Sequence, residues 1–395
     1  MEEKNVVLGV TGGIAVYKAL DVVSRLKKHN INVHVIMTES ACKFVTPLSF
    51  QSLSQNMVVK DMFEEPKSFE IQHISLSHKA DLIAVVPATA NIIGKVANGI
   101  ADDMLSTTIM ATKAKVIFAP AMNTNMYTNP ITQSNIQKLK DYGYGFINPG
   151  SGRLACGDIG EGKLADTEII TERILSELYE PKDMKGKKVV VTAGPTRADI
   201  DPVRFISNRS TGKMGFAIAE EARDRGAEVV LVSGPTDLKD PQGMKVVRVN
   251  TNGEMLNAVM SEYDDADIVV KAAAVSDYKI KEYSSEKIKK GDGNLVLEFV
   301  RDNDILKTLG ERKKNQILVG FAAESNDLIK NAEKKLEKKN LNYIVANNIV
   351  QDNAGFGTDT NIVTIIKRDG TIRSLESMSK RKVGHELFKM ILSNE

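Results

Sequence analysis

Residues 5–26, NVVLGVTGGIAVYKALDVVSRL, contain the pattern on which the prediction of the fold rests. Val6–Val10 is a short, β-branched apolar run of the kind found in buried strands. Apolar residues then recur at helical spacing, at Val16, Ala19, Leu20, Val23 and Leu26. Gly9, Gly12 and Gly13 lie at or near the junction. We therefore expect a strand, a tight glycine turn and a helix.

The same alternation continues along the first half of the chain. Further strands are expected at 31–37, 82–86 and 116–119, separated by amphipathic stretches. The fully apolar runs LIAVV and VIFA suit parallel strands that helices cover on both faces. This pattern predicts an α/β fold with a doubly wound sheet.

The pattern stops near residues 178–188 and then starts again. The segment LYEPKDMKGKK has no clear period and contains Pro181 and Gly186. After it come KVVVTAGPT, a helix expected at 213–225, and EVVLVSGPT. More strands are expected at 245–249, 268–272, 317–321, 343–346 and 361–366, and the polar segment 282–294 is expected to be a loop or short ribbon. We predict two Rossmann-like doubly wound domains with mainly parallel sheets, 1–181 and 182–395.

Composition excludes several classes of protein. The 53 basic and 51 acidic residues give a net charge of +2, which disfavours a general nucleic-acid binder. An apolar fraction of 42% excludes wholesale disorder. Cys42 and Cys156 cannot form a disulfide framework and fit a reducing cytoplasm. No run of about 18 apolar residues is present, and the first apolar run is too short for a signal peptide, so we expect a cytoplasmic protein without membrane spans.

Polar and glycine residues follow the expected strands of the first half. Gly12 and Gly13 would let backbone N–H groups approach an anion, although the spacing is neither GxGxxG nor a P-loop, and a plain tight turn is the alternative. Thr89 and Asn91 follow the strand at 82–86, where ligands of parallel sheets bind, or they cap a helix. Asn123 follows the next strand, with an Asx-turn as its alternative.

Two further features of the first half could take part in proton transfer. His73 carries the side chain best suited to move protons near neutral pH, although a lone histidine is more often structural or solvent-exposed. Segment 148–162, NPGSGRLACGDIGEG, has five glycines between 150 and 162 and contains Cys156. A lid that closes over a ligand would explain this composition, and an ordinary surface loop is the alternative.

The second half contains residues suited to phosphate chemistry. Residues 193–215 contain Asn208, followed by Ser, Thr, Gly and Lys just before the expected helix, a composition typical of phosphate cradles. Asp277 follows a strand and could hold Mg²⁺ together with nucleotide phosphates. The lysine-rich runs 286–290 and 330–340 are, from composition alone, solvated faces.

Together these stretches resemble the bifunctional phosphopantothenoylcysteine decarboxylase / phosphopantothenate–cysteine ligase family of coenzyme A biosynthesis. The resemblance covers about residues 5–390 and follows the family's order. Its most specific parts are GIADDML, PAMNTNM, LACGDIGEG, DPVRFISNRSTGKMG, and AAAVSDY followed by EKIKK. One such stretch would be weak evidence, whereas five in order are specific.

The resemblance implies that the first domain is an FMN-dependent decarboxylase in which the flavin carries the redox chemistry. His73 would be the base or orienting group, Asn123 would bind the substrate carboxylate or the intermediate, and Cys156 would donate the proton during reduction of the ene-thiol. Tyr127 stands where the family usually has Trp. The implied FMN contacts are Gly12, Gly13, Thr38, Thr89, Asn91 and Ser106.

The resemblance implies that the second domain is a ligase that joins L-cysteine to 4'-phosphopantothenate through an acyl-cytidylate made from CTP. Lys287 would support formation of the acyl-cytidylate, Asn208 the attack of cysteine, and Asp277 the Mg²⁺ ion. Asn303 stands where the family often has Pro. The implied CTP contacts are Lys271, Ala272, Ala273, Asp277, Lys287, Asn303, Asp304, Ile305, Leu306, Phe321, Lys335 and Lys339.

The resemblance also implies homo-oligomers, with trimeric flavin domains whose sites lie at subunit contacts and paired ligase domains, giving a dodecamer. Two other functions are considered. Some relatives of the flavin half are regulatory subunits that have lost catalytic residues, but His73, Asn123 and Cys156 are all present here. A dehydrogenase with two Rossmann-like domains would be expected to carry GxGxxG, which these turns lack.

Overall fold

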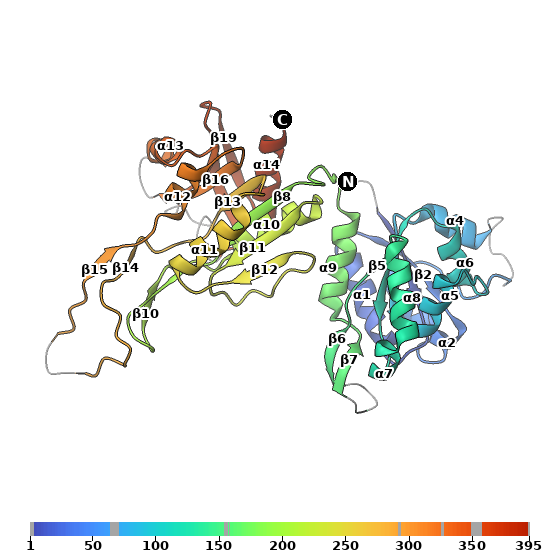
Figure 1. Ribbon diagram of the computed structural model, residues 1–395. Helices are drawn as coiled ribbons and strands as arrows, with labels where there is room; N and C mark the ends of the chain where they lie inside the picture. The colour runs from blue at the N-terminus through green and yellow to red at the C-terminus, as the bar shows by residue number, and fades with distance from the viewer. Residues whose placement is uncertain are drawn as a thin grey trace. The chain divides into compact units, whose positions relative to one another are not determined.

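The computed structural model describes residues 4–63, 71–153, 157, 159–290, 294–324, 328–348 and 358–393. The chain divides into two compact units, 1–178 and 179–395, and each is described here by itself (Figure 1).

Unit 1 is built on a five-stranded parallel sheet in the order β2-β1-β3-β4-β5. Its strands are β1 (Asn5–Val10), β2 (Asn32–Met37), β3 (Leu82–Ala88), β4 (Lys115–Pro120) and β5 (Gly145–Phe146). The chain starts in the interior of the sheet at β1, adds β2 on one side, and crosses to β3 on the other. This order creates a switch point between β1 and β3, where ligands of open α/β sheets bind.

Helices cover both faces of this sheet. One face packs on α1 (Val16–Lys28), α3 (Pro47–Ser54) and α9 (Thr167–Leu178), and the other on α4 (Gln72–Lys79), α5 (Ala90–Ala97), α6 (Met104–Ala111) and α8 (Pro130–Asp141). In β1, Val6, Leu8 and Val10 point to the first face and Val7 to the second. Burial on both faces explains why these strands are continuous apolar runs, and each buried Val or Leu stabilises the fold by about 1.5–3 kcal/mol.

The remaining elements of unit 1 lie near the ends of the strands. They are the short helices α2 (Glu39–Cys42) and α7 (Thr124–Thr128) and the antiparallel pair β6 (Gly150–Arg153) and β7 (Ile159–Lys163).

Unit 2 is built on an eight-stranded sheet in the order β12-β11-β8-β13-β16-β17-β18-β19. The first six strands are parallel, and β18 and β19 are antiparallel. The bounds are β8 (Lys188–Ala193), β11 (Glu228–Ser233), β12 (Lys245–Arg248), β13 (Ile268–Lys271), β16 (Ile317–Glu324), β17 (Tyr343–Asn348), β18 (Thr360–Lys367) and β19 (Ile372–Ser379). The switch point of this sheet lies between β8 and β13.

Two helical layers cover the sheet of unit 2. Helices α10 (Lys213–Asp224) and α14 (Lys380–Leu392) pack on one face, and α11 (Asn252–Tyr263), α12 (Ile305–Arg312) and α13 (Leu328–Lys338) on the other. Two short antiparallel pairs, β9 (Arg197–Asp199) with β10 (Phe205–Ser207) and β14 (Tyr278–Ile280) with β15 (Phe299–Arg301), extend from the body of the unit (Figure 1). We call β14, β15 and the residues between them the arm.

The first residues of unit 2 are fastened to α10 and α14. The Tyr179 hydroxyl donates to Glu221, with 2.5 Å between the oxygens, and the Arg381 guanidinium lies over the Tyr179 ring. Glu221 is fully buried and also accepts from Arg381, and it lies 3.2 Å from a ring nitrogen of His385. Burial and Glu221 raise the pKa of Tyr179, which therefore keeps the proton that it donates.

The predicted fold class, α/β with mainly parallel sheets, is confirmed. The predicted strands all form, within a few residues of the expected ends. Strand β19 was not predicted, because its residues, IRSLESMS, are mostly polar or exposed. It lies at the edge of the sheet, where one neighbour is sufficient and burial is low. Among the described residues, no helix is long and apolar enough to cross a membrane.

Candidate functional sites in the two units

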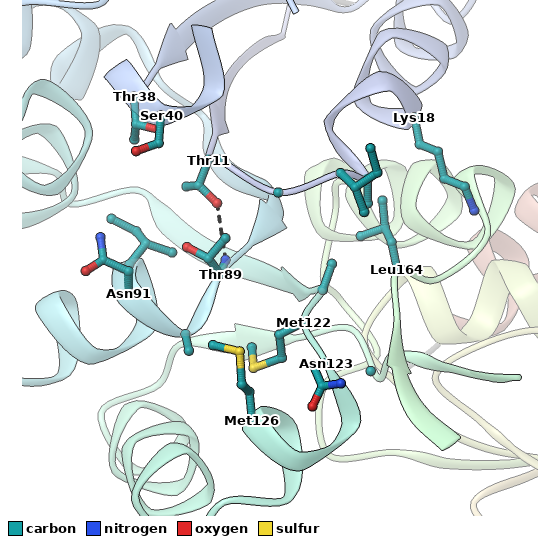
Figure 2. Close-up of a pocket in the computed structure, with 18 of the residues that line it drawn as sticks. Thr11, Lys18, Thr38, Ser40, Thr89, Asn91, Met122, Asn123, Met126 and Leu164 are labelled. Atoms are coloured by element: carbon teal, nitrogen blue, oxygen red, sulfur yellow. Dashed lines mark hydrogen bonds between the residues drawn. The ribbon is translucent and has the colours of Figure 1, made fainter. Parts of the chain in front are cut away.

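A pocket of about 1130 Å³ opens in unit 1 at the carboxyl ends of β1, β3 and β4 (Figure 2). It lies at the switch point of the sheet, as expected for this topology. Five of the six residues predicted to contact FMN line it, namely Gly12, Gly13, Thr38, Thr89 and Asn91, and so does Asn123.

The turn after β1 comes very close to α2. A Cβ atom at Gly12 would lie 2.4 Å from the Ser40 Cβ and 2.8 Å from its backbone carbon, so only glycine fits there. Thr11 joins this turn to the next one, since its hydroxyl donates to the Pro87 carbonyl at 2.7 Å and accepts from the Thr89 N–H at 3.2 Å (Figure 2). The two turns at the switch point are thus held together by one buried side chain.

Two helices begin at this pocket without a side-chain cap. Ala15 precedes α1 and offers no capping oxygen, and the Thr89 hydroxyl makes no capping bond to α5. Uncapped first-turn N–H groups and the helix dipole favour an anion. The volume, the mixed polar and apolar lining and these two helix starts fit a flavin nucleotide with its phosphate.

Asn123 is held in place by local structure. Its side-chain oxygen accepts from the Asn125 N–H at 2.8 Å, which caps α7 and fixes the orientation of the amide. On the other side, the Met122 N–H donates to the Gly162 carbonyl of β7. Gly162 has φ +127°, and a Cβ there would lie 2.4 Å from the Met122 carbonyl oxygen. The pair β6–β7 therefore packs tightly beside Asn123.

Two predicted residues of the first unit, His73 and Ser106, are not in the lining of this pocket. His73 lies half-buried in α4, on the face of the sheet that also carries α6. Ser106 is fully buried, and its hydroxyl is bound to Asp103 in the capping box of α6. Cys156 lies outside the described residues. Tyr127 is half-buried and packs against the apolar cluster beneath α5 and α8.

The lining also contains residues that the sequence interpretation did not name. The charged ones among them are Lys18, Glu39, Lys95, Asp103, Arg153 and Lys163. Lys18 faces the pocket because it is in the first turn of α1, directly after the glycine turn. The position of Lys18 just after the glycine turn could have identified it from the sequence. Arg153 and Lys163 reach the pocket through the pairing of β6 with β7, which the sequence does not indicate.

In unit 2, predicted residues meet at the switch point between β8 and β13. The loops after these strands pair through Pro195 and Ala274, and the Ala274 N–H donates to the Gly194 carbonyl at 2.9 Å. The Asn208 amide donates to the Ala274 and Val275 carbonyls at 2.9 and 3.2 Å. Asn208 is therefore brought directly to the segment 271–277.

A cluster of opposite charges lies at the end of β13. The pKa of Lys271 is influenced by the charges of four nearby side chains, which are those of Lys335, Lys339, Asp277 and Asp304. Lys339 forms an ion pair with Asp304, with 3.0 Å between nitrogen and oxygen, and Lys339 lowers the pKa of Asp304 despite its partial burial. Burial, helped by the charge of Lys339, lowers the pKa of Lys271 to about 8. Three lysines against two carboxylates leave a site suited to a polyanion.

Other predicted CTP contacts lie in the core or at its edge. Ile305 and Leu306 are buried in the first turn of α12, and the Ala273 N–H donates to the Thr192 hydroxyl at 3.2 Å. Phe321 is half-buried against the apolar core, as is Ala272. The side chains of Ile305 and Leu306 pack inward, so only their backbone is left for a ligand.

Lys287 is exposed on the arm. The next residue is held firmly, because the Ile288 N–H donates to Asp201 at 3.2 Å and its carbonyl accepts from Arg204 at 2.9 Å. Arg204 and three backbone N–H groups hold the pKa of buried Asp201 well below its usual range, so this carboxylate stays charged. Asp201 and Arg204 therefore hold in place the loop that carries Lys287.

Two family models match the chain. Residues 1–179 match the family described as Flavoprotein, and residues 184–394 match the DNA/pantothenate metabolism flavoprotein C-terminal domain. The coenzyme A biosynthesis bifunctional protein CoaBC of Bacillus subtilis is 52% identical over 394 residues, which are 99% of this chain and 97% of that protein. The protein of the same name from Escherichia coli is 42% identical over 93% of this chain and 91% of its own length. This chain belongs to the CoaBC family.

A solved structure of one CoaBC domain is also similar to part of this chain. The crystal structure of the C-terminal domain of a CoaBC protein is 44% identical and covers 54% of this chain and all of that chain, with a TM-score of 0.47. Membership of the CoaBC family confirms the prediction of a bifunctional enzyme of coenzyme A biosynthesis, and it does not favour a regulatory subunit without catalysis. The match to the Flavoprotein family, residues 1–179, covers nearly the same residues as unit 1.

Proposed function

We propose that residues 182–395 ligate L-cysteine to 4'-phosphopantothenate with CTP, and that residues 1–181 decarboxylate the product, 4'-phosphopantothenoylcysteine, to 4'-phosphopantetheine with FMN. The observation that supports this most is the presence of two different sites, each at a sheet's switch point. The first is a large pocket with two helix starts that lack a side-chain cap, and the second is a lysine-rich charge cluster. A cytoplasmic location stays a prediction.

In the decarboxylase unit, Gly12, Gly13, Thr38, Thr89 and Asn91 would hold FMN, because they line the pocket beside the two helix starts. When bound, FMN would supply reversible oxidation of the carbon that bears the thiol, so that the electron pair left by the departing CO₂ is delocalised as a thiolate. Asn123, fixed by its capping bond, would bind the substrate carboxylate. His73 would act as the base or orienting group, and Cys156 would return a proton.

In the ligase unit, the cluster at the end of β13 would bind the triphosphate of CTP. Asp277 is exposed just beyond the strand, and a single carboxylate with phosphate oxygens is a usual way to hold Mg²⁺. No group of three or more metal-ligating side chains occurs among the described residues, so the phosphates would supply most ligands. Lys287 would neutralise the charge that develops on the α-phosphate when the carboxylate attacks it, and Asn208 would support attack by the cysteine amine.

We also propose that the protein works as a homo-oligomer, with trimeric flavin units and paired ligase units assembled as a dodecamer. The supporting observation is the position of His73, which does not line the pocket of its own chain. A neighbouring copy would then supply this histidine to the pocket.

Lys271 predicts a pH dependence of nucleotide binding. Its pKa of about 8 means that it is mostly charged at pH 7 and loses its proton as the pH rises through 8. Because a triphosphate favours the charged form, we expect the affinity for CTP to fall by several fold between pH 7 and 9. The same low pKa reduces the free energy of unfolding below pH 8, and this cost is relieved at higher pH.

Calorimetric titration of CTP at several pH values checks this prediction. Lys271→Gln should bind more weakly at pH 7 and lose most of the pH dependence, whereas Lys314→Gln, at an exposed lysine of the same unit, should behave like the parent protein. An unchanged slope in Lys271→Gln would assign the titration to another group.

Mass spectrometry of the products tests the function as a whole. With CTP, L-cysteine, 4'-phosphopantothenate and FMN, the protein should release CMP and form 4'-phosphopantetheine. Without CTP it should form neither product from these substrates, but it should still decarboxylate added 4'-phosphopantothenoylcysteine. A folded protein that makes no CMP, or that stays colourless with FMN and leaves this substrate intact, would refute the corresponding half.

A further inference from the structure

Asn252 is a buried amide at the start of α11, and it reaches two loops of unit 2 at once. Its side chain is 2% exposed. The amide nitrogen donates to the Asn303 carbonyl at 2.8 Å and lies 3.4 Å from the Ser276 carbonyl oxygen, the second and weaker contact. The amide oxygen is buried and has no hydrogen-bond partner among the residues that the structure describes.

The two carbonyls lie just outside the two ends of the arm. Ser276 lies shortly before β14, and Asn303 lies shortly after β15. The strands are also joined to each other there, since the Asp302 N–H donates to the Asp277 carbonyl at 2.9 Å. Asn252 adds a connection from α11 to the residues on either side of the arm, and so holds the base of the arm against the body of the unit.

The stability of α11 does not account for this side chain. Thr251 is the N-cap, and its hydroxyl accepts from the Glu254 N–H at 3.2 Å in a complete capping box. Asn252 adds no cap, asparagine is a poor helix former, and its buried, unpartnered oxygen costs free energy. Because asparagine is unfavourable for the helix in these ways, we explain its presence by the two carbonyl groups that its amide nitrogen contacts.

The residues next to these carbonyls are those of the proposed CTP site. Asp277 follows Ser276, and Asp304 follows Asn303 and pairs with Lys339. The arm also carries Lys287. We propose that Asn252 is a positioning residue of the ligase reaction, which sets the place of Asp277 and Asp304 relative to β13 and keeps the arm in register. This inference rests on the proposed function, because it assumes that CTP binds at this cluster.

The test compares Asn252→Ala and the isosteric Asn252→Asp with Thr251→Ala, which removes the cap of the same helix and leaves the two carbonyl bonds. One lost neutral hydrogen bond, about 0.5–1.5 kcal/mol, corresponds to roughly a two- to twelve-fold change. We expect kcat/KM for CTP to fall by this factor in Asn252→Ala, mainly through KM. The fall should be at least as large in Asn252→Asp, whose carboxylate faces two carbonyl oxygens.

Thr251→Ala should lower the melting temperature of the protein without changing KM for CTP. Decarboxylation of added substrate by unit 1 should be the same in all variants, which gives an internal measure of active protein. The inference is overturned if KM for CTP changes equally in Asn252→Ala and Thr251→Ala, if neither Asn252 variant changes it, or if neither folds. A parent protein that releases no CMP from CTP would instead refute the proposed function.

Discussion

Replacing Lys287 by glutamine is expected to slow formation of the acyl-cytidylate by roughly 100- to 1000-fold, the usual effect of removing one charge-stabilising donor from a transition state. Lys287 is exposed on the arm, so the substitution removes a charge without opening a cavity. The loop should stay in place, because its hold on Asp201 and Arg204 is made by the backbone of Ile288. Release of pyrophosphate from CTP and 4'-phosphopantothenate in the absence of cysteine, followed in a single turnover, measures the step directly.

Lys289→Gln is the matched control, since it removes the same charge from the same exposed run. It should change the rate by no more than a few fold. Decarboxylation by unit 1 should be unaffected in both variants. Equal rates for Lys287→Gln and Lys289→Gln would mean that the run acts only through its overall charge.

Gly12→Ala is expected to cause the largest loss in unit 1, with flavin affinity falling by roughly ten- to a hundred-fold. The added methyl group would meet both the side chain and the backbone of Ser40, so the turn or α2 must move. Overpacking of this kind costs about 1–3 kcal/mol, and here the displaced turn belongs to the proposed flavin site. The purified variant should be less yellow than the parent, and fluorescence titration with FMN measures the change in affinity.

Gly94→Ala serves as the control in the same unit, because a methyl group there would make only an ordinary contact of 3.7 Å with Asn135. It lies inside α5, where alanine is the better helix former. This variant should bind flavin as the parent does and be at least as stable. Full flavin content in Gly12→Ala would show that the turn after β1 does not touch the cofactor.

Much of the fold could be predicted because its strands are buried on both faces. Runs such as LIAVV and KVVV can be recognised as strands without knowing which strands they pair with. The topology of the sheet then brings Gly12, Thr89 and Asn123 to one pocket. Lys271 is the last residue of β13, a strand beside the switch point of the second sheet. Asn208 follows β10, in a separate pair of strands, and reaches the loop after β13 through the bonds from its amide to Ala274 and Val275. For all of these residues except Asn208, position at the end of a strand of the main sheets was sufficient information.

Other features could not be predicted because they depend on pairing between distant segments. Arg153 and Lys163 reach the pocket through the β6–β7 pair, and Asn252 gains its partners from residues 24 and 51 positions away. Ser106 is an FMN contact implied only by the family resemblance, and in the structure its hydroxyl takes part in the capping box of α6. Side-chain direction within a first helical turn decides between these roles, and single-sequence patterns carry little of that information.

The contacts of Tyr179 with Glu221 of α10 and Arg381 of α14 matter when the two units are expressed separately. A fragment cut at the boundary predicted from the sequence, with Lys182 first, would lack the hydroxyl that fully buried Glu221 accepts from. Arg381 and His385 would remain beside that carboxylate, but with one fewer donor and an exposed gap where the ring had lain. A fragment of unit 2 that begins directly after α9, at Tyr179, keeps the contacts of Tyr179 with Glu221 and Arg381.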